Sequence, residues 1–193
     1  MVKLLIIPGS TRKEAFSKQF AAAVAKLSLG DDDVEVTVVD LAEYNMPLYD
    51  GDLEESEGMP PEAVAFREVV KQHEAVVFVS PEYNASIPAV LKNAIDWLSR
   101  PYKNDPDVAV WAGKVAGLLA SSPGALGGMR GLVHLRQILM NVGMQVVSEQ
   151  FALGTAHEAF DDEGSLKSDR HRAAVAKVVG SVTRMAKALS ATA

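Results

Sequence analysis

The strongest pattern in the chain is a set of apolar runs without polar alternation, at residues 4–7, 75–79 and 114–120. Runs of this length and aliphatic content predict strands, and the lack of alternation is typical of strands that helices cover on both faces. Two further strands are predicted at residues 34–40, which alternate, and at residues 145–153, which are mixed in polarity. A wetter face is typical of the edges of a sheet.

Helical spacing of apolar residues follows each predicted strand. Gly30 ends the first helix, Pro60–Pro61 and Pro88 open two others, and Ser168 is an expected N-cap for the last. Five strands therefore alternate with five helices. Right-handed crossovers and the two edge strands favour an α/β, doubly wound, five-stranded parallel sheet of flavodoxin-like order 2-1-3-4-5, with helices on both faces. Residues 1–193 are expected to form a single domain.

Two connections stand out by length. Residues 41–60 are predicted to be irregular, and they become acidic towards their end. Loops of this length are uncommon and often have a function or lie against a partner. Residues 100–112 form a second connection, in which we expect Trp111 to be exposed.

Composition narrows the classes of function. The formal net charge of −6 and the pI near 5.2 predict a field that repels polyanions, so nucleic acid is not an expected partner. Without cysteine there is no disulfide or thiolate chemistry, and the four histidines lack metal-ligand spacing, so no metal site is predicted. No apolar run approaches the roughly 20 residues of a membrane span, and the start of the chain shows no signal-peptide pattern. These features predict a soluble, cytoplasmic protein.

The loop after the first strand has the groups that bind a phosphate monoester. Gly9-Ser10-Thr11-Arg12 precedes a helix whose first turn contains Ser17. Hydroxyls, N–H groups at a helix N-terminus and a guanidinium together suit a phosphate. Neither a G-x-G-x-x-G fingerprint nor a Walker loop occurs, which favours a mononucleotide. The alternative is that Ser10 and Thr11 only form a turn and a cap.

The loops after the third and fourth strands converge on the same edge in this strand order. Residues 81–86 offer an amide at Asn84 and an aromatic face at Tyr83, for which partial packing is the alternative. Residues 121–128 are glycine-rich, which permits close approach of a ligand to the backbone. No G-x-S-x-G hydrolase elbow occurs. Arg130 is interpreted as a solvated helix charge, with contact to a dinucleotide phosphate as the alternative.

Two of these stretches, residues 9–12 with Ser17 and residues 81–97, resemble the NADPH-dependent FMN reductase family, which includes bacterial quinone, chromate and azo-dye reductases. The resemblance implies bound FMN, with NADPH or NADH as co-substrate and a quinone, free flavin, chromate or azo compound as acceptor. It implies alternating hydride transfer through the flavin, with no catalytic side chain. It also implies a homodimer or homotetramer, for which residues 41–60 are a candidate contact surface.

Matching positions assign the FMN site residue by residue. The resemblance places Ser10, Arg12, Ser17 and Gln19 at the phosphate, Pro81, Glu82, Tyr83, Asn84 and Ser86 in the loop along the isoalloxazine and ribityl, and Ser121, Ser122 and Gly124 at the far edge. Gln19 stands where the family usually has Asn, and Ala85 and Pro88-Ala89 also depart from its pattern. Two other functions remain open, a flavodoxin-type electron carrier without a pyridine-nucleotide site and a non-redox binding module.

Overall fold

The computed structural model describes residues 1–30, 33–102 and 110–191. The strands are β1 (Val2–Pro8), β2 (Val34–Val38), β3 (Ala75–Ser80), β4 (Val115–Ser121) and β5 (Gln145–Leu153). The helices are α1 (Phe16–Ser28), α2 (Gly51–Glu57), α3 (Pro61–Lys71), α4 (Ala89–Leu98), α5 (Met129–Asn141) and α6 (Asp169–Ser190), with 3-10 turns at Leu41–Glu43 and Ala156–Glu158.

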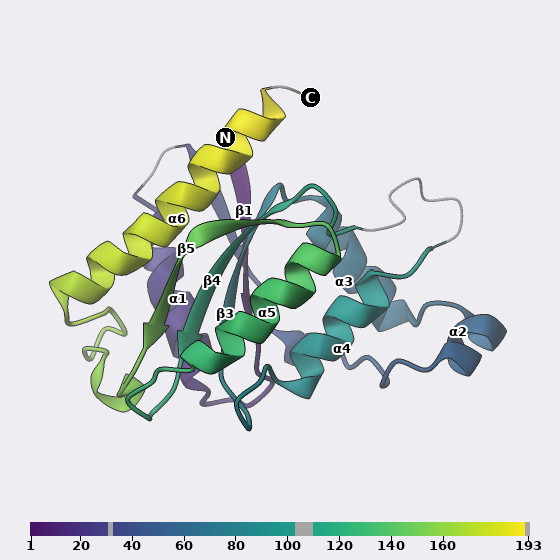
Figure 1. Cartoon of the computed structure of the whole chain (residues 1–193), viewed down its shortest axis with the longest axis horizontal. Coiled ribbons are helices and arrows are strands. Elements are labelled where there is room, and N and C mark those ends of the chain that lie inside the picture. Colours follow the sequence, from purple (N-terminus) through teal and green to yellow (C-terminus); the bar gives the residue numbers. More distant parts are fainter. Residues whose placement is uncertain (31–32, 103–109, 192–193) are drawn as a thin grey trace.

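One parallel sheet organises these elements, in the order β2-β1-β3-β4-β5 (Figure 1). The predicted strand order and flavodoxin-like architecture are therefore confirmed. Alternate residues of the central strands enter two separate apolar clusters. Leu5 and Phe78 pack with α3, α4 and α5 on one face, whereas Leu4 and Val77 pack with α1 and α6 on the other. Cover on both faces explains why these strands lack polar alternation.

The predicted start of the last helix is also confirmed. The Ser168 hydroxyl accepts a hydrogen bond from the backbone N–H of His171 and caps α6. Within the described residues, none of the helices combines the length and the apolar character needed to cross a membrane.

The prediction that residues 41–60 are irregular throughout was wrong. This segment contains a 3-10 turn and α2, whose N-terminus is capped by the Asp50 carboxylate. Acidic residues in the first turn favour a helix because they complement its dipole, and Asp52 and Glu54 have this role. The Pro47 carbonyl accepts hydrogen bonds of 2.8 Å from the side chains of both Asn93 and Trp97, so the segment is fastened to α4.

The prediction that Trp111 is exposed was also wrong. Its side chain is fully buried, packs at an angle against the Phe78 ring, and donates a hydrogen bond from Nε1 to the Ile95 carbonyl. The chain returns to the core at this point, just before β4. Most of the rest of that connection, residues 103–109, lies outside the described residues.

Candidate functional site

Three loops form one rim at the carboxyl edge of the sheet, after β1, β3 and β4 (Figure 1). The loop after β1 approaches the loop after β3 closely at Gly9, whose N–H bonds to the Val79 carbonyl at 2.9 Å. A Cβ at this position would lie 3.0 Å from the Leu91 side chain and 3.3 Å from Pro81, so only glycine fits without displacement. A hydrogen bond of 3.3 Å between the hydroxyls of Ser10 and Tyr83 joins the same two loops.

The N-terminus of α1 at this rim is open. Its N-cap residue is Ala15, and no side chain in the described part of the chain caps it by a hydrogen bond. Exposed Arg12 lies just before it, and the Arg12 N–H donates to the Ser10 hydroxyl. Unsatisfied N–H groups and the helix dipole make such an end suitable for an anion.

Two hydroxyls at the rim are buried and have no hydrogen-bond partner among the described residues. They are Oγ of Ser17, in the first turn of α1, and Oγ of Ser121, the last residue of β4. Buried polar groups almost always have a partner, so an orphan at a loop edge needs explanation, and an absent ligand is one. Both orphans are among the residues assigned to FMN, and the donor set at the rim fits a phosphorylated flavin.

The other residues predicted to bind FMN differ in their exposure and in their contacts. Tyr83 and Asn84 are exposed, Tyr83 beside the two-residue turn after β3 and Asn84 within it, and Pro81 is half-buried. Ser122 and Gly124 lie in the loop after β4, where the Ser122 hydroxyl accepts the Gly124 N–H. Gln19 lies on the exposed side of α1, and within the described residues its side chain bonds to none of the other predicted residues.

Glu82 differs from its neighbours because its carboxylate is fully engaged. It accepts hydrogen bonds from the Arg130 guanidinium and, at 3.1 Å, from the Gly131 N–H. Burial alone would raise the pKa of Glu82, but the bonds from Arg130 and Gly131 outweigh it and leave the pKa lowered. The sequence suggested that Arg130 is a solvated surface charge. In the structure it is instead bonded to Glu82. The two residues are 48 positions apart, and no local pattern pairs them.

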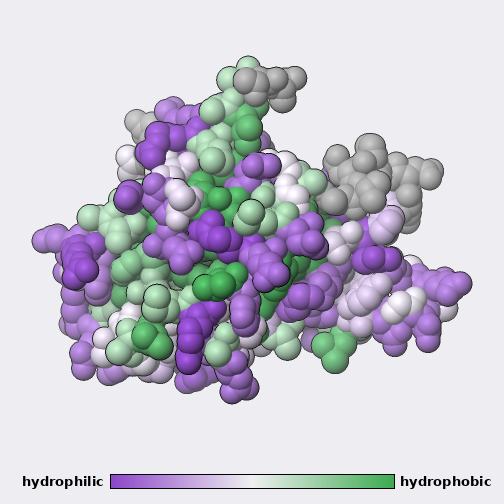
Figure 2. Space-filling view, in the orientation of Figure 1, coloured by the Kyte–Doolittle hydropathy of each residue, from purple (hydrophilic) through white to green (hydrophobic). Residues whose placement is uncertain are grey.

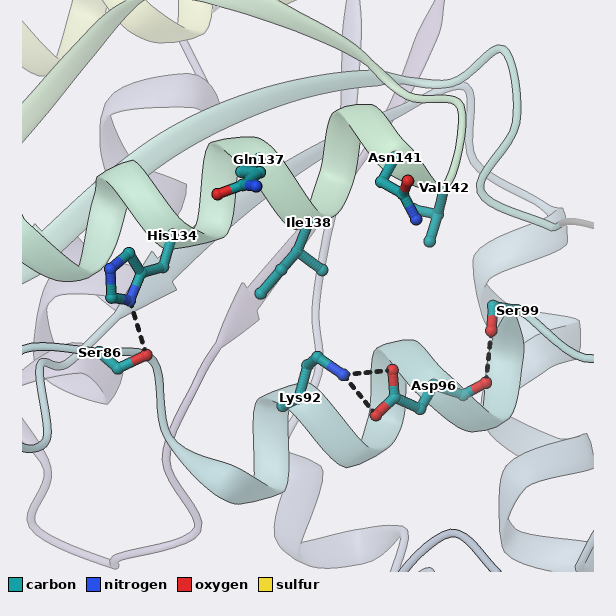
Figure 3. Close-up of a pocket in the computed structure, with 9 residues that line it drawn as sticks. All are labelled: Ser86, Lys92, Asp96, Ser99, His134, Gln137, Ile138, Asn141 and Val142. Carbon is teal, nitrogen blue, oxygen red and sulfur yellow. Dashed lines mark hydrogen bonds and ion pairs between the residues drawn. The ribbon is translucent and has the colours of Figure 1, made fainter. Parts of the chain in front are cut away.

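A groove of about 590 Å³ runs from the turn after β3 along α4 and α5. Figure 3 shows Lys92 and Asp96 of α4 paired on one side, and His134 of α5 bonded to Ser86 at the end nearest the rim. The His134–Ser86 hydrogen bond is 2.9 Å long. Sequence reasoning did not find His134, because a lone histidine on a helix carries no signal for a site.

A parallel sheet of this order, with an open helix N-terminus and unpartnered hydroxyls at the point where strand order reverses, defines a flavodoxin-like mononucleotide-binding protein. Comparison with known proteins narrows the class further. A sequence model of the NADPH-dependent FMN reductase family matches residues 2–158, and the chain belongs to this family.

Named relatives agree with that family. The chain is 37% identical to a quinone reductase of Pseudomonas putida over 163 residues, covering 83% of this chain and 82% of the relative. It is 37% identical to the quinone reductase of Escherichia coli K12 over 155 residues, covering 79% and 77%. Among solved structures, FerB of Paracoccus denitrificans, a flavoenzyme NAD(P)H:(acceptor) oxidoreductase, matches with a TM-score of 0.82 and 26% identity, covering 97% of this chain and 98% of FerB.

These findings confirm the predicted enzyme class, an NAD(P)H-dependent oxidoreductase that uses FMN. They favour this reading over the flavodoxin-type carrier. The individual FMN contacts stay a prediction, which the geometry above supports at Ser17 and Ser121.

Proposed function

We propose that the chain, as a single domain of residues 1–193, binds FMN at the rim and reduces quinones with NADPH or NADH. The observation that carries this proposal is the buried, unpartnered hydroxyl of Ser17 at the open N-terminus of α1. A phosphate there would accept hydrogen bonds from Ser17, Ser10 and the backbone, and Arg12 would neutralise its charge.

Each loop has a distinct task in this proposal. The chemistry that FMN would supply there is hydride transfer from the nicotinamide to the acceptor, with a proton added from solvent when the acceptor is a quinone. The loop after β1 holds the phosphate, the turn at Tyr83 and Asn84 supports the ring, and Ser121 offers a donor at the far edge. The chain supplies orientation and hydrogen bonds and needs no nucleophile of its own, which agrees with the lack of cysteine.

Quinones are the proposed acceptors because the relatives described above from Pseudomonas putida and Escherichia coli are named quinone reductases. Free flavin, chromate and azo compounds belong to the wider set that the family resemblance predicts. We further propose a cytoplasmic location. We also propose that nucleic acid is not a partner, because a net charge of −6 repels polyanions.

A homodimer or homotetramer is part of the same proposal. Leu48, in the segment of residues 41–60, is 76% exposed. Apolar side chains also interrupt the polar surface along α5 (Figure 2), where Met129, Val133 and Met140 are exposed. Apolar surface of this kind is common at protein interfaces. The oligomer size is measured by light scattering coupled to gel filtration.

The test of the proposed function is anaerobic. Protein saturated with FMN is titrated with NADPH and, separately, with NADH, and then with 1,4-benzoquinone, while the flavin absorbance is followed. Bleaching by the nucleotide and recovery with the quinone are expected. Binding of FMN without bleaching by either nucleotide would favour the electron carrier, and failure to bind FMN would favour a non-redox module.

A further inference from the structure

The Glu82 carboxylate joins two parts of the rim that are far apart in sequence. Its Oε1 accepts from Arg130 Nε at 2.8 Å and its Oε2 accepts from the Gly131 N–H at 3.1 Å. The Glu82 side chain is only 6% exposed, whereas the side chain of Arg130 is 59% exposed. The contact is therefore an anchored carboxylate with an arginine laid over it from the solvent side.

This carboxylate replaces the missing cap of α5. The N-cap residue of α5 is Gly128, which has no side chain to cap the helix. A carboxylate that accepts a first-turn N–H complements the positive end of the helix dipole. Gly131 allows the approach, because a Cβ there would lie 3.3 Å from the Ser86 carbonyl oxygen. The loop after β3 and the start of α5 are thus packed as one unit.

The turn that follows Glu82 needs such support. Tyr83 and Ser86 exchange backbone hydrogen bonds of 3.0 and 3.1 Å, and both residues between them have positive φ, 50° at Asn84 and 64° at Ala85. This is the type I′ combination, which glycine and asparagine adopt readily and alanine does not. Unfavourable backbone conformations persist only where the surroundings hold them.

We propose that Glu82 is a positioning residue, whose bonds to Arg130 and Gly131 fix the Tyr83–Ser86 turn in the shape that receives the flavin. This inference rests on the proposed function, and it changes the role assigned to Glu82 from flavin contact to support. With the turn held in advance, binding of FMN does not have to order it, which preserves affinity.

The first test needs no flavin. Hydrogen exchange is measured on FMN-free protein for wild type, Glu82→Gln and the control Glu55→Gln, which removes the same charge from an exposed site on α2. Faster exchange in Glu82→Gln is expected at residues 83–86 and at the start of α5, with β1 and β3 unchanged. Because it does not depend on FMN, this result stands even if the proposed function fails.

The second test measures the cofactor. Glu82→Gln is expected to raise the Kd for FMN about tenfold, because hydrogen bonds to a charged group are lost. Arg130→Gln should raise it less, since the Gly131 contact remains, and the double variant should match Glu82→Gln alone. At saturating FMN, kcat is expressed per bound flavin, because a merely destabilised protein would lower the apparent kcat at unchanged KM. A fall in kcat per bound flavin, with the wild-type KM for NADPH, is the expected result.

Two results would overturn the proposal. One is a Glu82→Gln protein whose turn exchanges as slowly as wild type. The other is an FMN Kd within twofold of wild type. If Glu82→Gln does not fold, Arg130→Gln decides alone: unchanged exchange at residues 83–86 together with unchanged FMN affinity refutes the role.

Discussion

Two of the helices that begin at the rim, α1 and α5, have N-termini in opposite states. The first turn of α1 has no side-chain cap and a buried Ser17 hydroxyl without a partner among the described residues. The first turn of α5 is occupied by the Glu82 carboxylate. Both ends attract anions, but only the end of α1 is open to a ligand. In the proposed site, one helix start would be completed by the cofactor, whereas the other is completed by the chain itself.

The largest expected effect tests the open end. Arg12→Ala should weaken FMN binding by about tenfold to a hundredfold, because a charge-assisted contact to the phosphate contributes about 1.5–3 kcal/mol. Lys13→Ala is the matched control, since it removes the same charge from the adjacent exposed position. Fluorescence titration gives both Kd values, and equal effects of the two substitutions would mean that only net charge matters.

Ser17→Ala should move stability and affinity in opposite directions. Without FMN, removing a buried unpartnered hydroxyl should stabilise the protein by about 1 kcal/mol, which raises Tm by roughly 2–4 °C. The Kd for FMN should increase about tenfold, because a phosphate partner is lost. Calorimetry of the FMN-free protein and a flavin titration measure the two effects, and a drop in Tm would show that the hydroxyl has a partner within the protein.

Acid should protonate Glu82 and so remove the carboxylate that occupies the N-terminus of α5. The lowered pKa of Glu82 means that its contribution to stability is complete above the ordinary carboxyl pKa near 4.5 and is lost as pH falls through the lowered value. The Tm of wild type should exceed that of Glu82→Gln by a constant amount above pH 5, and the gap should shrink below pH 4. Asp40 and Glu54, whose pKa values are also lowered, titrate in both proteins and cancel. A gap that does not depend on pH would refute the charge as its source.

The smallest effect concerns the turn beside the occupied end. Ala85→Gly should raise the Tm of the FMN-free protein by about 1–2 °C, because the left-handed strain of alanine slightly exceeds the extra chain entropy of glycine. The same change at Ala22, on the exposed side of α1, should lower Tm, since a helical glycine costs about 1 kcal/mol. Thermal unfolding of both variants would show whether the turn is strained.

The fold could be predicted from sequence where one strong effect acts locally. The apolar runs at residues 75–79 and 114–120 predict buried strands because burial on both faces leaves no place for polar residues. Trp111 was misjudged because its burial depends on a distant partner, Phe78. Residues 41–60 were misjudged although the acidic first turn of α2 is a local signal, because bonds from the distant residues Asn93 and Trp97 fasten the segment.

In the candidate site, too, local signals could be read from the sequence, whereas contacts between distant residues could not. Ser17 could be proposed as a phosphate contact from the sequence, because a hydroxyl in the first turn after a glycine loop is a local signal for phosphate. That its hydroxyl is buried and unpartnered is known only from the packing around it. The bonds from Arg130 to Glu82 and from His134 to Ser86 each span 48 residues, so nothing in the spacing of the sequence announces them.

The missing side chain at Gly9 has a consequence for how this rim can vary. Leu91 and Pro81 stand at 3.0 and 3.3 Å from where a Cβ would be, so any larger residue would push the Leu91 side chain or Pro81 by a few tenths of an ångström. The contacts at Gly9 thereby limit, from the sheet edge, how the two loops of the proposed flavin site can be spaced.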